Sequence, residues 1–130
     1  MRRLAIDVQS GDYIVARLPA DAPTPANLLD PRAPVLVSIT RTPTELSIIC
    51  PSELAPEGAE TEAGWRLLTV RGPLAFTLTG IIAALSGELA AAGVALFSLS
   101  TFDTDHILVR QDELQRAVDT LRASGHEVGV

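Results

Sequence analysis

The segment WRLLTVRGP, residues 65–73, decides the fold of this chain. Its first six residues are mostly apolar and strand-forming, and they predict a β-strand that Gly72-Pro73 then ends. Apolar residues over 78–92 follow the three-and-four spacing of an amphipathic helix, with Thr77 as the expected N-cap. We therefore expect a strand that leads into a helix packed on a sheet.

The rest of the second half completes a known pattern of elements. Short apolar runs over 94–99 and 106–109 predict two neighbouring strands, and the polar residues 100–105 form the turn between them. A second amphipathic helix is expected over 112–124, and residues 126–130 suit a closing strand. The resulting order, β-α-β-β-α-β, is that of the ferredoxin-like split βαβ unit.

The first half of the chain repeats this order in a weaker form. The Pro-rich stretch 19–34 disfavours helix because proline lacks a backbone donor and restricts the residue before it. Aligning 38–49 with 98–109 pairs similar residues at most structural positions, which indicates an internal repeat. We therefore expect an α+β protein with two ferredoxin-like modules in tandem, residues 1–61 with reduced helices and residues 62–130.

Composition and charge exclude several classes of function. The 130 residues carry a net charge of −6 with ten scattered arginines, so no nucleic-acid partner is expected. The longest nearly uncharged run contains Pro and Gly and is too short to span a bilayer, so we expect no membrane partner and a cytoplasmic location. Cys50 is the single cysteine, which excludes an internal disulfide, and we expect a small buried side chain, not a reactive thiol.

No pattern of catalytic or metal-binding residues stands out. The glycines are isolated, so phosphate-loop and dinucleotide fingerprints are missing, and no acid/base pair accompanies an activated nucleophile. His106 and His126 lie far apart without a neighbouring cysteine and are expected at strand edges, not in a metal site. We therefore expect a protein that is not an enzyme and that holds no metal ion or cofactor.

Residues 65–82 and 99–109, the latter with the motif Ser100-Thr101-Phe102-Asp103-Thr104-Asp105, resemble the small tandem ACT-domain proteins. Within that family they are similar to the CASTOR-type arginine sensors and, more distantly, to the ACT modules of aspartate kinase. The resemblance implies βαββαβ modules, a free amino acid held at a module interface, and a non-catalytic regulatory or sensor function. It also implies that modules pair into a continuous sheet. The larger sensors have four modules and this chain has two, so a homodimer would supply the same number.

The resemblance also implies where the ligand lies. In the related sensors, the amino acid lies between the first-strand-to-helix loop of one module and the strand-turn-strand edge of another. The corresponding residues of this chain are Gly72, Phe76, Thr79 and Gly80 in the loop, and Ser100, Thr101, Asp103 and Asp105 in the turn.

The chemistry of these residues suits a zwitterionic ligand. A helix N-terminus preceded by glycines offers N–H groups to a carboxylate, and Asp103 or Asp105 would pair with an ammonium or guanidinium group. Strand alternation puts Asp105 on the same face as Ile107 and Val109, so we expect Asp105 to contribute more to binding than Asp103. Turn and packing geometry alone would also explain these residues. The alternative function is therefore a ligand-independent protein-interaction or oligomerisation module.

Overall fold

The computed structural model of the chain describes residues 3–74 and 79–130. Two compact units make up the fold: an N-terminal unit, Gly11–Gly64, and a C-terminal unit that joins Met1–Ser10 to Trp65–Val130. Within the described residues, both α-helices belong to the C-terminal unit. The protein is therefore α+β, with helices reduced in its first half as the sequence predicts.

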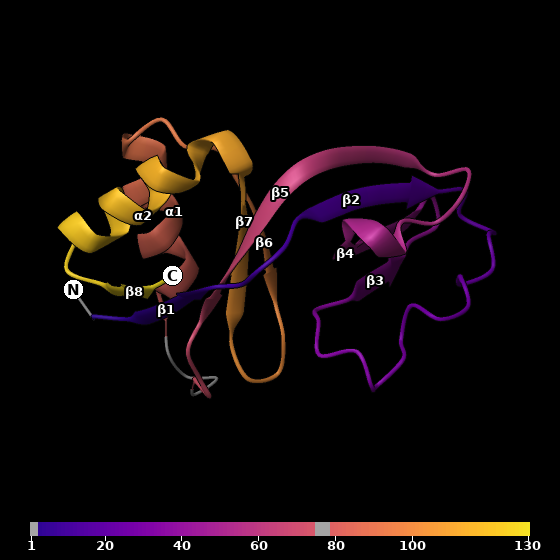
Figure 1. Cartoon of the computed structure of the whole chain (residues 1–130), viewed down its shortest axis with the longest axis horizontal. Helices are drawn as coiled ribbons and strands as arrows, with labels where there is room; N and C mark the ends of the chain where they lie inside the picture. Colours follow the sequence, from indigo (N-terminus) through magenta and orange to yellow (C-terminus); the bar gives the residue numbers. More distant parts are fainter. Residues whose placement is uncertain (1–2, 75–78) are drawn as a thin grey trace. The chain divides into compact units, whose positions relative to one another are not determined.

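The C-terminal unit is a sheet with two helices (Figure 1). Its strand order is β6-β7-β5-β1-β8, and all pairs are antiparallel except β1 with β8. From β5 onward, the elements follow the predicted β-α-β-β-α-β order. Strand β5, Glu60–Val70, begins in the N-terminal unit and enters this unit at Trp65. The other elements of this unit are β1 Ala5–Val8, α1 Ile81–Ala91, β6 Leu96–Ser100, β7 Asp105–Arg110, the 3-10 turn η2 Gln111–Glu113, α2 Leu114–Ala123 and β8 Glu127–Gly129.

The core of the C-terminal unit joins one face of the sheet to both helices. Leu68 and Val70 alternate on the same face of β5 and cluster with Leu85 of α1 and Leu121 of α2. None of these four side chains is more than 1% exposed. Because apolar residues four apart form one stripe along α1, the predicted helical spacing produces the observed packing.

Helix α1 begins three residues later than the apolar spacing predicts. The sequence suggests Thr77 as N-cap, but Thr77 lies outside the described residues and the N-cap of the observed helix is Gly80. Gly80 has a φ of 79°, a left-handed conformation that glycine adopts without the steric cost of a Cβ atom. This glycine therefore marks the start of the helix.

The N-terminal unit contains a smaller antiparallel sheet with the strand order β3-β4-β2. Its core contains Ile14, Ile48 and Cys50, together with Leu28 from the irregular segment 19–37 between β2 and β3. That segment forms no helix, as its prolines predict. The elements of this unit are β2 Tyr13–Leu18, β3 Ser38–Arg41, β4 Leu46–Pro51 and the 3-10 turn η1 Ser52–Leu54.

Strand β1 belongs to the C-terminal unit, although the predicted module 1–61 includes it. Ile6 of β1 is paired with Val70 of β5 on one side and with Val128 of β8 on the other. Both partners are more than 60 residues away in the chain, so no local pattern encodes the pairing. The compact units therefore differ from the predicted modules in the position of β1.

Cys50 is fully buried in β4, which confirms the prediction of a small core side chain. Burial raises the pKa of the thiol to about 11, with a smaller contribution from the negative charge of Glu53. Because the fold opposes ionisation, this group is expected to lower the stability of the protein only as the pH rises above about 9.

We expect Cys50 to be unreactive in the native protein. At pH 8, a thiol with this pKa is ionised in only on the order of one molecule in a thousand, and its burial also excludes reagents. Ellman's reagent should therefore modify the native protein very slowly and should react with one thiol at once in concentrated guanidinium chloride. Rapid reaction under native conditions would contradict the burial of this residue.

Candidate functional site

The loop after β5 is bound to the β6–β7 turn at one edge of the C-terminal unit. The Thr104 hydroxyl donates a hydrogen bond to the carbonyl of Val70 at 2.6 Å, and the Leu74 N–H donates to the carbonyl of Asp103 at 2.6 Å. Between these two bonds lies Gly72. A Cβ atom at this position would lie 3.0 Å from both the Asp103 oxygen and the Thr104 Cβ. The close approach of loop and turn therefore favours glycine at position 72, because a side chain would push the two apart.

The β6–β7 turn has its own hydrogen bonds. The Thr101 N–H donates to the carbonyl of Thr104 at 2.8 Å, which closes the turn. Ser100 and Asp105 are paired across the two strands, and the Ser100 hydroxyl donates to Asp105 Oδ1 at 2.6 Å. Asp105 is partly buried whereas Asp103 is exposed. The two carboxylates of the turn therefore differ in solvation.

An ion pair lies beside this loop. Arg71 donates through Nη2 to Asp7 Oδ1 at 2.7 Å and through Nε to Asp7 Oδ2 at 3.2 Å. These hydrogen bonds lower the pKa of Asp7, chiefly because they favour its charged form. Sequence reasoning missed the pair because the residues are 64 positions apart and meet only when β1 pairs with β5.

Among the described residues, no three His, Cys, Asp or Glu side chains converge in a way that would hold a metal ion.

Two family models together match most of the chain. One, described as an ACT domain, matches residues 60–123, and another, described as an N-terminal domain, matches residues 11–58. The solved structure of protein Atu0741 from Agrobacterium tumefaciens is 38% identical with a TM-score of 0.88, over 98% of this chain and 93% of that chain. This chain belongs to the ACT-domain family.

The chain is also similar to a curated sensor. Over 73 residues it is 40% identical to the Rattus norvegicus protein named cytosolic arginine sensor for mTORC1 subunit 1, and this match covers 55% of this chain and 22% of the sensor. The chain therefore spans about a fifth of the length of the curated relatives that it matches.

A regulatory subunit of an enzyme has the same fold. The ligand-free regulatory subunit of aspartate kinase from Thermus thermophilus superposes with a TM-score of 0.66, over 95% of this chain and 99% of that chain. At 10% identity this likeness supports the fold alone. Together, the matches confirm the resemblance to ACT-domain proteins.

The ACT domain brings most of the predicted ligand residues to one edge of its sheet. Thr79 and Gly80 are exposed directly before α1, and Phe76 lies outside the described residues. The loop and the turn that adjoin each other here belong to one ACT domain, whereas the family arrangement places a ligand between the loop of one module and the turn of another. The residues that lie together are Gly72, Ser100, Thr101, Asp103 and Asp105.

We expect Gly72→Ala to lower the free energy of unfolding by about 1–3 kcal/mol, the usual cost of overpacking a tight contact. The new methyl group would meet a backbone oxygen and a Cβ atom, neither of which moves without shifting the loop from the turn. Gly87→Ala is the matched control, because a Cβ atom at that position of helix α1 would meet no atom within 4 Å. That change should stabilise the protein by about 0.5–1 kcal/mol through helix propensity. Urea unfolding of both variants tests the contact, and equal effects would contradict it.

Proposed function

We propose that this ACT-domain protein binds a free amino acid and acts as a non-catalytic regulatory or sensor protein. The observation that carries the proposal is the hydrogen-bonded edge where the Leu74 N–H meets the Asp103 carbonyl and Gly72 adjoins Thr104. The similarity to a protein named as an arginine sensor supports an amino acid as the class of ligand.

In this proposal, the protein offers one group of opposite charge to the ligand carboxylate and another to the ligand cation. The ligand carboxylate binds at the N-terminus of α1, where backbone N–H groups carry the positive end of the helix dipole. Among the described residues, no side chain caps these groups. The ligand cation, an ammonium or a guanidinium group, pairs with Asp105, whose carboxylate is oriented by the Ser100 hydroxyl.

A second ACT module completes the site in this proposal, and a homodimer supplies it. Among the described strands, β6 pairs with β7 alone, and an open strand edge favours association with another chain. We expect light scattering at micromolar concentration to give about twice the monomer mass of 13.7 kDa. A mass of one monomer over the same range would count against the homodimer.

The proposed location is the cytoplasm, which agrees with the word cytosolic in the name of the sensor. In the part of the chain that the structure describes, no helix has both the length and the apolar composition needed to cross a membrane.

A thermal-shift screen of the twenty amino acids tests the proposal. A ligand that binds only the folded state raises the melting temperature in proportion to the logarithm of its concentration. We expect one amino acid, with arginine tested first, to raise it saturably while its D-enantiomer does not. A flat response to all twenty would reject the amino-acid proposal and favour the ligand-independent interaction module.

A further inference from the structure

The segment between β2 and β3 forms an open groove in the N-terminal unit. A hollow of about 410 Å³ is lined by side chains from 24–32, and a second hollow of about 180 Å³ is lined by side chains from 28–37. Leu29, Asp30 and Pro31 line both hollows, so the two hollows adjoin each other at these residues. We call this feature the Leu29 groove.

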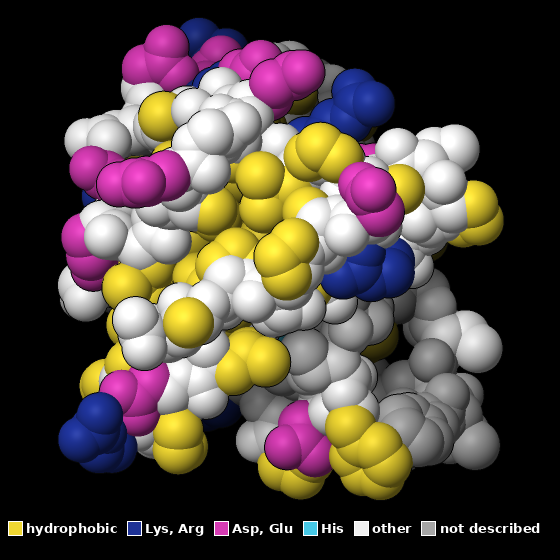
Figure 2. Space-filling model, turned by 90° about the vertical axis from the view of Figure 1, so that its right-hand side faces the viewer, with side chains coloured by type: hydrophobic (Ala, Val, Ile, Leu, Met, Phe, Trp, Pro, Cys, Tyr) yellow, Lys and Arg dark blue, Asp and Glu magenta, His cyan; other side chains and the backbone are white. Residues whose placement is uncertain are grey.

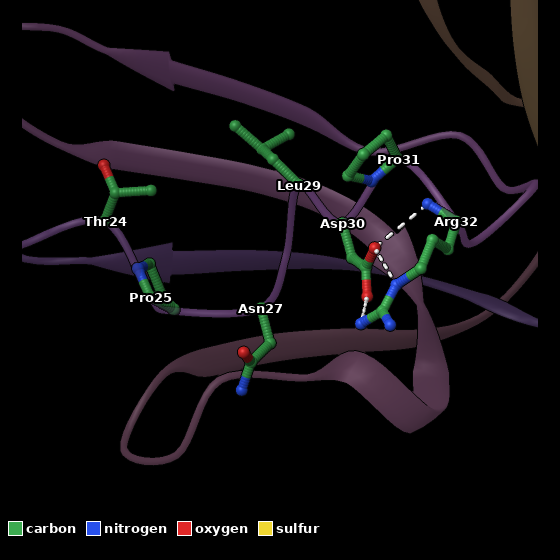
Figure 3. Close-up of a pocket in the computed structure, with 7 residues that line it drawn as sticks. All are labelled: Thr24, Pro25, Asn27, Leu29, Asp30, Pro31 and Arg32. Carbon is green, nitrogen blue, oxygen red and sulfur yellow. Dashed lines mark hydrogen bonds and ion pairs between the residues drawn. The ribbon is translucent and has the colours of Figure 1, made fainter.

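The walls of the groove are held by specific bonds. Figure 3 shows the larger hollow, with Thr24 and Pro25 on one side and Asp30 and Arg32 on the other. The Asp30 carboxylate accepts hydrogen bonds from the Arg32 backbone N–H at 3.0 Å and from its guanidinium at 3.0 and 2.9 Å.

Two further anchors fix the segment to the sheet. From β3, the Arg41 guanidinium donates to the carbonyl of Ala22 at 2.7 Å and also to the carbonyl of Ala20. Leu28 is only 4% exposed and packs in the core of the N-terminal unit. The groove is therefore bound to the sheet of its own unit through both backbone and side chains.

Apolar side chains along this groove are exposed to solvent. Leu29 is 66% exposed and Val35 is 39% exposed, and both line the groove. Figure 2 shows one face of the chain, on which hydrophobic side chains gather among separate acidic and basic groups. Covering such side chains is the usual source of affinity at a docking surface.

The charge of the N-terminal unit selects the kind of partner. Gly11–Gly64 contains eight carboxylates and three arginines, a net charge of −5 out of the −6 of the whole chain. Glu53, Glu57 and Glu60 are exposed on the segment after β4, and Leu54 and Ala59 of that segment pack in the same core cluster as Leu28. The net negative charge of this unit therefore attracts a basic partner and repels an acidic one.

An open strand edge adjoins the groove. Among the described strands, β3 pairs with β4 alone, so alternate residues of β3 direct their N–H and C=O groups away from the sheet. Val35 and Val37, which line the smaller hollow, precede β3 directly. An extended peptide that pairs with β3 would therefore place alternate side chains along the groove.

We propose that the Leu29 groove and the free edge of β3 bind an extended segment of a partner protein in which Arg or Lys alternates with apolar residues. The apolar side chains cover Leu29 and Val35, the basic ones face the acidic surface, and the backbone extends the sheet. This surface lies in the N-terminal unit, so the proposal does not depend on the amino-acid site of the C-terminal unit.

The test uses a fluorescein-labelled octapeptide of alternating Arg and Val, titrated with the full chain and followed by fluorescence anisotropy. We expect saturable binding that weakens at least about tenfold when Glu replaces Arg, or when N-methyl groups block alternate peptide amides. Leu29→Ser should weaken binding at least about tenfold, since it removes an exposed apolar contact. Val130→Ser, at an 86% exposed apolar position of the other unit, is the matched control and should leave the affinity unchanged.

Other occupants of the groove give different results. Equal affinities for wild type and Leu29→Ser, equal binding of the acidic or N-methylated peptide, or no saturable binding would each overturn the proposal. A dimer that becomes monomeric on Leu29→Ser without peptide would overturn it in favour of a second copy of this chain. In a 15N-labelled sample, peptide should shift the amides of 24–41 and leave those of 100–105 in place. The reverse pattern would also reject the proposed surface.

Discussion

His126→Ala is expected to lower the free energy of unfolding by about 3–5 kcal/mol, a large fraction of the stability of an ordinary small domain. The sequence suggested a strand-edge residue, but the structure buries this ring next to β8. The Leu4 N–H donates to Nδ1 at 3.0 Å, so Nε2 carries the proton and donates to Glu88 Oε1 at 2.9 Å. Truncation would leave a buried N–H and a mostly buried carboxylate without this partner, and would open a cavity.

His106→Ala is the matched control for this prediction. Its ring is half-buried on the sheet and makes a hydrogen bond of 3.0 Å with the Thr69 hydroxyl, so its loss should cost about 1 kcal/mol. Burial lowers the pKa of His106, so protonation of this ring below about pH 6.5 opposes folding. Above that pH the ring is neutral, and its hydrogen bond contributes fully to the stability of the protein. Urea unfolding at pH 8 should therefore compare the two variants. A similar loss of stability in both would contradict the special role of His126.

Asp105→Asn is expected to weaken binding of the amino acid found by the thermal-shift screen by about ten- to a hundredfold, or roughly 1.5–3 kcal/mol. The Asp105 carboxylate is partly buried and is oriented by Ser100, so a ligand cation paired with it is shielded from water. The asparagine oxygen still accepts the Ser100 bond, so the variant removes the charge and keeps the local geometry. Calorimetric titration measures the loss directly.

Asp103→Asn is the matched control in the same turn. The Asp103 side chain is exposed, and its main bond to the loop is made by the backbone carbonyl, which the substitution leaves in place. Loss of an exposed charge pair should therefore cost under about 1 kcal/mol of binding free energy. Equal affinities for wild type and Asp105→Asn would reject this position for the ligand cation, even if an amino acid binds elsewhere on the protein.

Local spacing in the sequence was sufficient to predict the fold of the second half. Helix α1 follows from an apolar period of 3.6, and the strands β5 and β7 follow from short apolar runs, both of which depend only on neighbours along the chain. The prolines between β2 and β3 likewise predicted the missing helix of the first half. The burial of Cys50 followed from its place at the end of an apolar strand.

The sequence by itself thus determined the α+β class, the order of elements and the type of residue in the polar turn. Only the tertiary structure decided that β1 joins β5 and β8, that Gly72 touches Thr104, and that the ring of His126 links Leu4 to Glu88. The Leu29 groove also appeared only in the structure, because residues 24–32 have no periodic pattern. The physical reason is distance along the chain: periodicity records which face of an element is apolar, whereas pairing and side-chain contacts between distant segments depend on how whole elements pack.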